Sequence, residues 1–127
     1  MSIKIKIIVA DMEFNAEFAD TPSAKKIIDI LPVKGKVSRW GDEIYFPIPL
    51  ELPLDETSRD EVEVGDIGYW PTGRAICIFF GPTPLSEGDK IKPASAVNIL
   101  GKVLDNTRPL KKVTDGTLIK IILPKEN

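Results

Sequence analysis

The sequence predicts a mostly β protein, a closed antiparallel barrel of about eight short strands with one main α-helix over residues 21–31. Three observations predict this fold. Short segments that alternate apolar and polar residues recur along the chain, turn residues separate them, and only one segment has the apolar spacing of a helix. The 127 residues contain no internal repeat and no linker, so we expect a single domain over residues 1–127.

The N-terminal part of the chain predicts two strands and the helix. Residues 3–10 alternate isoleucine with lysine, and residues 13–18 return after a short turn as a second strand. Thr21 is a good helix N-cap, and Pro22 suits the first helical position. Pro32 ends the helix. The apolar face of this helix consists of Ala24, Ile27, Ile28 and Leu31.

The remainder of the chain predicts further short strands. Residues 34–40 and 43–48 form a hairpin around Gly41 and Asp42. The proline-rich segment 47–53 must be an edge or an extended connector, because each proline removes a hydrogen-bond donor from a sheet. The later strands are expected at residues 66–70, 75–80, 97–103 and 118–123.

Composition excludes several classes of function. The chain has no histidine, so its own residues cannot form a Ser-His-Asp triad or a histidine-ligated zinc site. Its net charge of -2 disfavours nucleic acid, and no apolar run is long enough to cross a membrane. We therefore expect a cytoplasmic protein with no metal and no cofactor, and its richness in isoleucine, lysine and glutamate points to a thermophilic source. The single cysteine, Cys77, lies in an apolar run and is interpreted as a buried small hydrophobe.

Seven of the nine aromatic residues lie between positions 40 and 80. Neighbouring residues of a strand point to opposite faces, so within Tyr69-Trp70 and Phe79-Phe80 only one ring can enter the barrel. The outward rings either form a binding face or pack under loops, and the sequence leaves both readings open. On the first reading, the candidate ligand-binding residues are Arg39, Trp40, Glu43, Tyr45, Asp66, Tyr69, Trp70 and Arg74.

We expect five of these candidates to converge on one concave surface, with two carboxylates at its rim. The five are Trp40, Tyr45, Tyr69, Trp70 and Arg74. The rim carboxylates are Glu43 and Asp66, which serve equally well as turn residues. Arg39 and Arg74 are candidate anchors for a carbonyl or carboxylate, since a guanidinium offers a rigid fork of donors.

Three segments resemble strands of the cyclophilin barrel: VGDIGYWPTG at 64–73, RAICIFFG at 74–81 and AVNILGKV at 96–103. Together with WGDEIYFPIP at 40–49, they look more closely still like a group of small stand-alone prokaryotic proteins with a cyclophilin-like fold and no established activity. The resemblance spans nearly the whole chain. It implies a closed barrel with a ligand groove formed by the hairpin and the strand pair after residue 65.

Departures from the cyclophilin pattern decide which function the resemblance implies. The catalytic arginine of cyclophilins would fall in the stretch 43–47, which has none. In this register, the groove glutamine falls on Ala75, the groove phenylalanine on Cys77 and the histidine on Val97. We therefore expect a protein that binds a short peptide or a small organic ligand in an aromatic groove.

Two alternatives to a ligand-binding protein stay open. One is a weak peptidyl-prolyl cis-trans isomerase with Arg74 as the best candidate for a catalytic donor. The other is a purely structural partner in a larger complex, by analogy of fold alone. Cyclophilins also carry a second helix before their last strand, for which residues 104–117 leave little length. We expect the barrel mouth there to be poorly covered, so that a homodimer could bury it.

Overall fold

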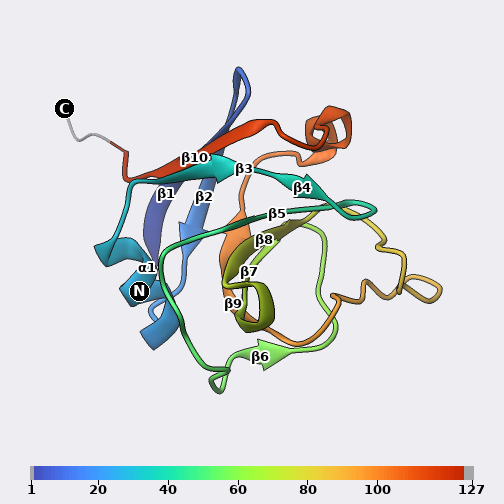
Figure 1. The fold of residues 1–127 in the computed structure, drawn as a ribbon, viewed down its shortest axis with the longest axis horizontal. Coiled ribbons are helices and arrows are strands. Elements are labelled where there is room, and N and C mark those ends of the chain that lie inside the picture. Colours follow the sequence, from blue (N-terminus) through green and yellow to red (C-terminus); the bar gives the residue numbers. More distant parts are fainter. Residues whose placement is uncertain (1, 125–127) are drawn as a thin grey trace.

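Antiparallel strands curl into a nearly closed barrel in the computed structural model, which describes residues 2–124 (Figure 1). The sheet has ten strands in the order β3-β10-β1-β2-β9-β7-β8-β5-β4, and β6 pairs with β9 off this path. The strands are β1 (Ile3–Val9), β2 (Met12–Phe18), β3 (Val33–Lys36), β4 (Ser38–Arg39), β5 (Glu43–Pro47), β6 (Ser58–Arg59), β7 (Asp66–Trp70), β8 (Ala75–Phe79), β9 (Val97–Val103) and β10 (Leu118–Ile122). The predicted mostly β barrel with one α-helix is confirmed, and the strand number exceeds the expected eight because β4 and β6 are two-residue strands.

The first hairpin shows how the alternating sequence builds the barrel wall. β1 and β2 pair in register from Ile3 opposite Phe18 to Val9 opposite Met12. The side chains of Ile5 and Ile7 are buried in the core, while the intervening lysine Lys6 faces outward and forms an ion pair with Glu13. Period-two alternation therefore places one face of this hairpin in the core and the other in solvent.

The α-helix α1 (Pro22–Asp29), the only one among the described residues, covers one end of the barrel. The Thr21 side chain accepts a hydrogen bond from the Ala24 backbone N–H at 3.2 Å, which caps the helix as the sequence predicts. The regular helix ends at Asp29, two residues before the predicted end. Ile27 is fully buried, whereas Ile28 is only partly buried against the core.

We expect Ile28→Ala to lower the free energy of unfolding by about 1–2 kcal/mol, less than the roughly 2–5 kcal/mol of a fully buried isoleucine. The reason is that Ile28 keeps part of its surface in solvent, while Ile27 on the same helix is 0% exposed. Urea unfolding of Ile28→Ala and Ile27→Ala checks that the loss is smaller for Ile28→Ala. The exposed Lys26→Ala serves as the control. A larger loss for Ile28→Ala than for Ile27→Ala would contradict the observed helix orientation.

The second mouth of the barrel is closed by the chain itself. A short 3-10 helix, Arg108–Lys112, lies between β9 and β10, and Leu110 and Val113 are buried in the main core. The expectation that this mouth is poorly covered is therefore wrong, because the short 3-10 helix and the residue that follows it insert two apolar side chains into the core. The homodimer stays a prediction, without the uncovered mouth as its support.

Adjacent side chains of β5, β7 and β8 enter two different apolar clusters. Tyr69 and Phe80 point into the main core, whereas Trp70 and Phe79 belong to a second cluster on the outer face of the barrel wall. The prediction that only one ring of each pair enters the barrel is confirmed. We call the second group the outer cluster; it comprises Val62, Cys77, Phe79, Ile91 and Val97, with Tyr45, Trp70 and Ile99 packed against them.

The outer cluster is covered by the long segment between β8 and β9, residues 80–96 (yellow to light orange in Figure 1). Ile91 from this segment contributes to the outer cluster and pairs with Val62 across an isolated β-bridge. Thr83 ties the segment together, because its hydroxyl donates to the Lys92 carbonyl oxygen and its N–H donates to Ser86 Oγ at 2.8 Å. The barrel wall thus has an apolar outer face with an ordered cover.

Candidate functional site

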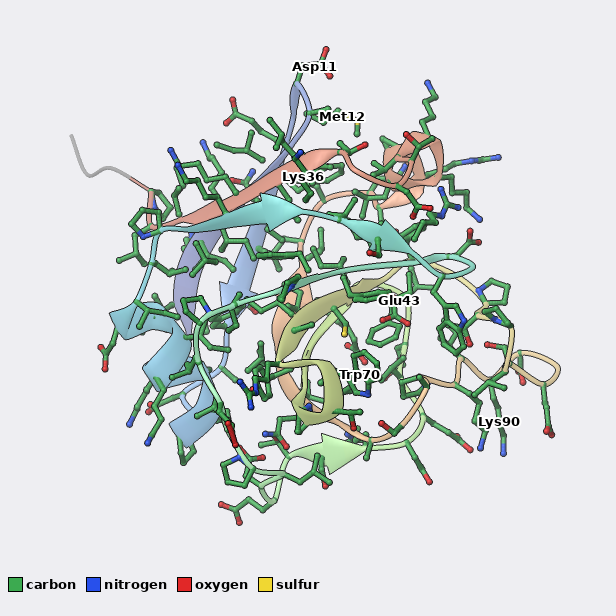
Figure 2. The ribbon with its side chains drawn as sticks, in the orientation of Figure 1. Asp11, Met12, Lys36, Glu43, Trp70 and Lys90 are labelled. Carbon is green, nitrogen blue, oxygen red and sulfur yellow. The ribbon has the colours of Figure 1, made fainter. Side chains whose placement is uncertain are left out.

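A cavity of about 160 Å³ lies between the outer face of the barrel wall and the covering segment. Its lining comes from the β4–β5 turn, from β5, β7 and β8, from the start of β9, and from the end of the covering segment. The lining residues are Trp40, Glu43, Tyr45, Trp70, Cys77, Pro93, Ala94 and Val97. Figure 2 shows Glu43 and Trp70 on the same side of the molecule, beside β5 and β8. A larger hollow of about 630 Å³ beside β6 is open to solvent and lined mostly by charged and polar side chains.

Strand register brings the cavity residues together. Tyr45 of β5 lies opposite Cys77 of β8, and Cys77 lies opposite Gly68 of β7 on its other side. Glu43 and Tyr45 share a face of β5 because they are two residues apart. Gly68 has no side chain, and a Cβ there would approach Val97 to 2.9 Å. The close approach of these strands therefore depends on a glycine beneath the cavity.

The aromatic wall of the cavity is held in place by specific contacts. The rings of Tyr45 and Trp70 pack edge to face, with centroids 5.8 Å apart and an interplanar angle of 78°. The Trp70 indole N–H donates to Ser95 Oγ at 2.6 Å, which ties this ring to the covering segment. Trp70 is thus held by a residue outside the lining and Tyr45 packs on Trp70, so neither ring needs a ligand to order it.

Glu43 is the only ionisable carboxyl group in the cavity lining. The Glu43 residue is 4% exposed, and its Oε1 has no hydrogen-bond partner among residues 2–124. Burial raises the pKa of the Glu43 carboxyl from 4.5 to about 7, and a hydrogen bond with the Cys77 thiol opposes part of this rise. An unpartnered carboxyl oxygen in an apolar setting is costly, and protonation of the carboxyl lowers that cost.

Cys77 is buried beside Glu43, as the sequence predicts for a small hydrophobe. Burial raises the pKa of its thiol well above the usual value, and the charge of Glu43 and the hydrogen bond with it act in the same direction. The thiol therefore stays protonated at physiological pH. It is a weak hydrogen-bond partner for Glu43 and a poor nucleophile.

Tyr69 does not reach the cavity, contrary to the expected convergence. Its ring is 0% exposed in the main core, and its hydroxyl donates to the Leu50 carbonyl oxygen at 2.7 Å. The same hydroxyl accepts from the Leu52 N–H at 3.1 Å. Alternation along β7 sends Tyr69 inward because Trp70 points outward. Tyr69 anchors the proline-rich connector after β5.

Arg74 also lies outside the cavity. It follows the 3-10 turn Pro71–Gly73 in the left-handed conformation, with φ 50°. Its side chain is 63% exposed and pairs with Glu51 at 3.0 Å. The left-handed residue ends the turn and aims the side chain away from the rings, so the best arginine candidate for an isomerase donor is absent from this cavity.

Asp66 also lies outside the cavity. Asp66 accepts a hydrogen bond from the Glu63 N–H at 2.8 Å and borders a separate surface hollow with Glu61, Val62 and Lys90. Its carboxyl therefore supports the turn before β7, which was the alternative interpretation. Partial burial raises the pKa of Asp66.

Arg39 is engaged in holding the β4–β5 turn. Its guanidinium donates to the carbonyl oxygens of Lys111 and Val113 at 2.8 Å and forms an ion pair with Asp42 at 2.8 Å. The same group lies 5.1 Å from the centre of the Phe80 ring. With these partners, and with the Nε–H donating to the Gly41 carbonyl oxygen at 2.6 Å, Arg39 positions the turn that carries Trp40 into the cavity lining.

The structure thus brings four of the eight candidates together: Trp40, Glu43, Tyr45 and Trp70. Glu43 was expected at the rim and is instead a buried member of the lining. Sequence reasoning missed Cys77, Pro93, Ala94 and Val97 as lining residues. The signal for two of them was present in the resemblance, since Cys77 and Val97 are the positions on which it placed the groove phenylalanine and histidine.

Among residues 2–124, no three Cys, Asp or Glu side chains gather closely enough to hold a metal ion. No helix in the same part of the chain is long and apolar enough to cross a membrane.

The fold and cavity define a class, a small β-barrel domain with a small aromatic-lined cavity on the outer face of its β5–β8 wall. The sequence profile of a family described as cyclophilin-like matches residues 3–122. The chain belongs to this cyclophilin-like family, as its resemblance to small stand-alone members implied.

One solved structure supports the assignment over nearly the full length. The chain is similar to a hypothetical protein from Archaeoglobus fulgidus whose structure was determined in solution. The two share 40% sequence identity with a TM-score of 0.81, over 97% of this chain and 95% of the other. A comparison with curated proteins finds no match. Because the structural relative is itself described as hypothetical, the similarity supports the fold of this chain and indicates no activity.

Proposed function

We propose that this protein binds a small organic ligand, or one side chain of a short peptide, in the cavity between Trp40, Tyr45 and Trp70. The observation that carries the proposal is Glu43, a buried carboxyl with an unpartnered Oε1 in an aromatic-lined cavity. An apolar pocket with few polar groups that fix orientation is the usual form of a small-molecule site.

The size of the cavity supports a small ligand. Drug-sized ligands occupy pockets of roughly 300–1,000 Å³, whereas this cavity measures about 160 Å³. It therefore suits a group about as large as one amino-acid side chain. The pre-packed Tyr45 and Trp70 rings favour binding further, because little conformational entropy is lost when they meet a ligand.

The isomerase alternative has weaker support. Catalysis of prolyl isomerisation by the scheme considered above needs an arginine donor close to the bound amide. Arg39 and Arg74 are both paired elsewhere, with Asp42 and Glu51 respectively. Ligand binding needs no arginine donor, so the residues that line the cavity support binding better than they support isomerase catalysis.

We expect Trp70→Ala to abolish binding of small probes that fit the cavity, while Arg74→Ala leaves binding unchanged. Trp70 forms a wall of the cavity and Arg74 lies outside it. The chain has two tryptophans, and both line this cavity, so intrinsic fluorescence reports on it directly. The probes are N-acetylproline amide, choline and neohexyl alcohol, titrated by fluorescence and by ligand-observed NMR.

The two variants also separate the proposed site from the one expected by sequence reasoning. Loss of binding in Arg74→Ala with retention in Trp70→Ala would overturn the proposal. So would the failure of every probe to change the fluorescence or NMR signals of the wild-type protein. Circular dichroism of both variants controls for folding, which neither side chain is expected to determine because both lie outside the main core.

A further inference from the structure

The polar lining of the cavity restricts the charge of its ligand. The one carboxyl group in the lining is Glu43, and neither lysine nor arginine is among the lining residues. A carboxylate or phosphate would meet Glu43 with no cation to offset the repulsion, and the neighbouring thiol of Cys77 stays protonated. The lining therefore disfavours the anionic ligand for which the surface arginines were considered.

We infer that the cavity binds a small cationic amine, either a protonated amine or a quaternary ammonium group, with Glu43 as its counter-ion and the Trp40, Tyr45 and Trp70 rings as its walls. The inference rests on the proposed ligand-binding function and names the chemical class of the ligand. A cation beside aromatic rings is stabilised by their quadrupoles, most strongly by tryptophan. Removal from water strengthens both this attraction and the ion pair.

Among the described residues, the groups around Glu43 include no cation that already pairs with its carboxyl, so the carboxyl is available to pair with a cationic ligand. The groups that share the cavity with it are the Cys77 thiol from β8, the Tyr45 phenol from β5 and the apolar residues Pro93, Ala94 and Val97. The adjacent Asp42 is paired with Arg39 at 2.8 Å and with Lys111 at 2.9 Å, so those two cations are occupied. No ion pair with a described residue neutralises Glu43.

The inference has a consequence for pH. Binding a cation favours the ionised form of Glu43, whose pKa burial raises to about 7 in the free protein. Below that pH, deprotonation of Glu43 must accompany binding, so affinity for a quaternary ammonium falls by about tenfold for each pH unit. Above it, the affinity levels off. A quaternary ammonium has no proton of its own, so the slope belongs to the protein.

The test compares three probes of nearly equal shape. Choline carries a positive charge. Neohexyl alcohol (3,3-dimethylbutan-1-ol) replaces the nitrogen of choline by carbon and is neutral. The third probe, tert-butylacetate, is the carboxylate 3,3-dimethylbutanoate and is an anion. We expect choline to bind wild-type protein at least about tenfold more tightly than neohexyl alcohol, with no binding of tert-butylacetate. The readouts are tryptophan fluorescence and ligand-observed NMR at mildly acidic, neutral and mildly basic pH.

Glu43→Gln should remove the preference for choline and its pH dependence, while neohexyl alcohol still binds. Glu43→Asp keeps the charge and serves as the conservative control, expected to retain a preference for choline. Should Glu43→Gln fail to fold, the pH slope for choline in the wild-type protein carries the test on its own. A flat slope between mildly acidic and neutral pH would then overturn the inference.

The outcomes separate this inference from the function on which it rests. If neohexyl alcohol binds as tightly as choline to wild-type protein, and Trp70→Ala abolishes both, the cavity binds ligands but the cationic class is wrong. Preferential binding of tert-butylacetate overturns the inference in the same way. If no probe binds wild-type protein at any pH, both the function and the ligand class are overturned.

Discussion

Glu43→Gln is expected to stabilise the folded protein by roughly 3 kcal/mol at mildly basic pH and to leave its stability nearly unchanged in acid. Burial raises the pKa of Glu43 from 4.5 to about 7, so the folded protein holds this proton more tightly than the unfolded chain does. The stability from that proton is fully present below pH 4.5 and is lost as pH rises through about 7. A glutamine has no carboxyl proton to release, so the free energy of unfolding of the variant does not fall with pH through this group.

Urea unfolding of wild-type and Glu43→Gln proteins, from mildly acidic to mildly basic pH, measures this difference. The matched control is Glu51→Gln, because Glu51 is exposed on the surface, where it pairs with Arg74. The control should follow the wild-type pH profile closely. Parallel profiles for Glu43→Gln and wild type would contradict the raised pKa, and a destabilised Glu43→Gln at every pH would indicate that the carboxyl has an internal partner.

Gly101→Ala is expected to lower the free energy of unfolding by at least about 3 kcal/mol. Gly101 lies in β9 between β2 and β7, opposite Phe18 on one side and Ile67 on the other. A Cβ at this position would lie 1.9 Å from the Glu17 carbonyl oxygen and 2.8 Å from the Phe18 Cα. Both are backbone atoms, so the strands themselves must separate to admit a methyl group.

The control for this substitution is Gly116→Ala. Gly116 has φ +87° but nothing lies within 4 Å of the added Cβ, so the cost there is backbone strain alone, about 1 kcal/mol. Chemical unfolding and thermal denaturation of both variants separate strain from steric clash. Equal losses at the two positions would show that the approach of β9 to β2 is looser than the structure indicates.

Most strands could be predicted from local patterns. The predicted bounds of β7 and β9 match those observed, because both strands are delimited by glycine or turn residues and contain alternating or apolar runs. The helix start was equally local, since Thr21 caps it through a bond to Ala24 only three residues away. These features depend on contacts between residues close together in the chain, so the sequence alone is enough to predict them.

The candidate site was predictable only in part. The sequence identified Trp40, Tyr45 and Trp70, because outward aromatic residues on adjacent strands must gather on one face. It misplaced Arg39, whose guanidinium is held by carbonyl oxygens more than seventy residues away, at Lys111 and Val113. Such long-range partners satisfy the donors that a local reading assigned to a ligand.

The sequence by itself determined the barrel, its main helix and the fact that only one ring of the pair Tyr69-Trp70 enters the barrel, because alternation along a strand is a property of the backbone. Which of the two rings points inward was decided by the tertiary structure. The sequence also determined that no histidine chemistry is available. Only the tertiary structure decided that Glu43 is buried. The covering segment brings Pro93 and Ala94 over the outer face of the barrel, beside Val97 of β9, and burial in this cavity raises the pKa of the Glu43 carboxyl.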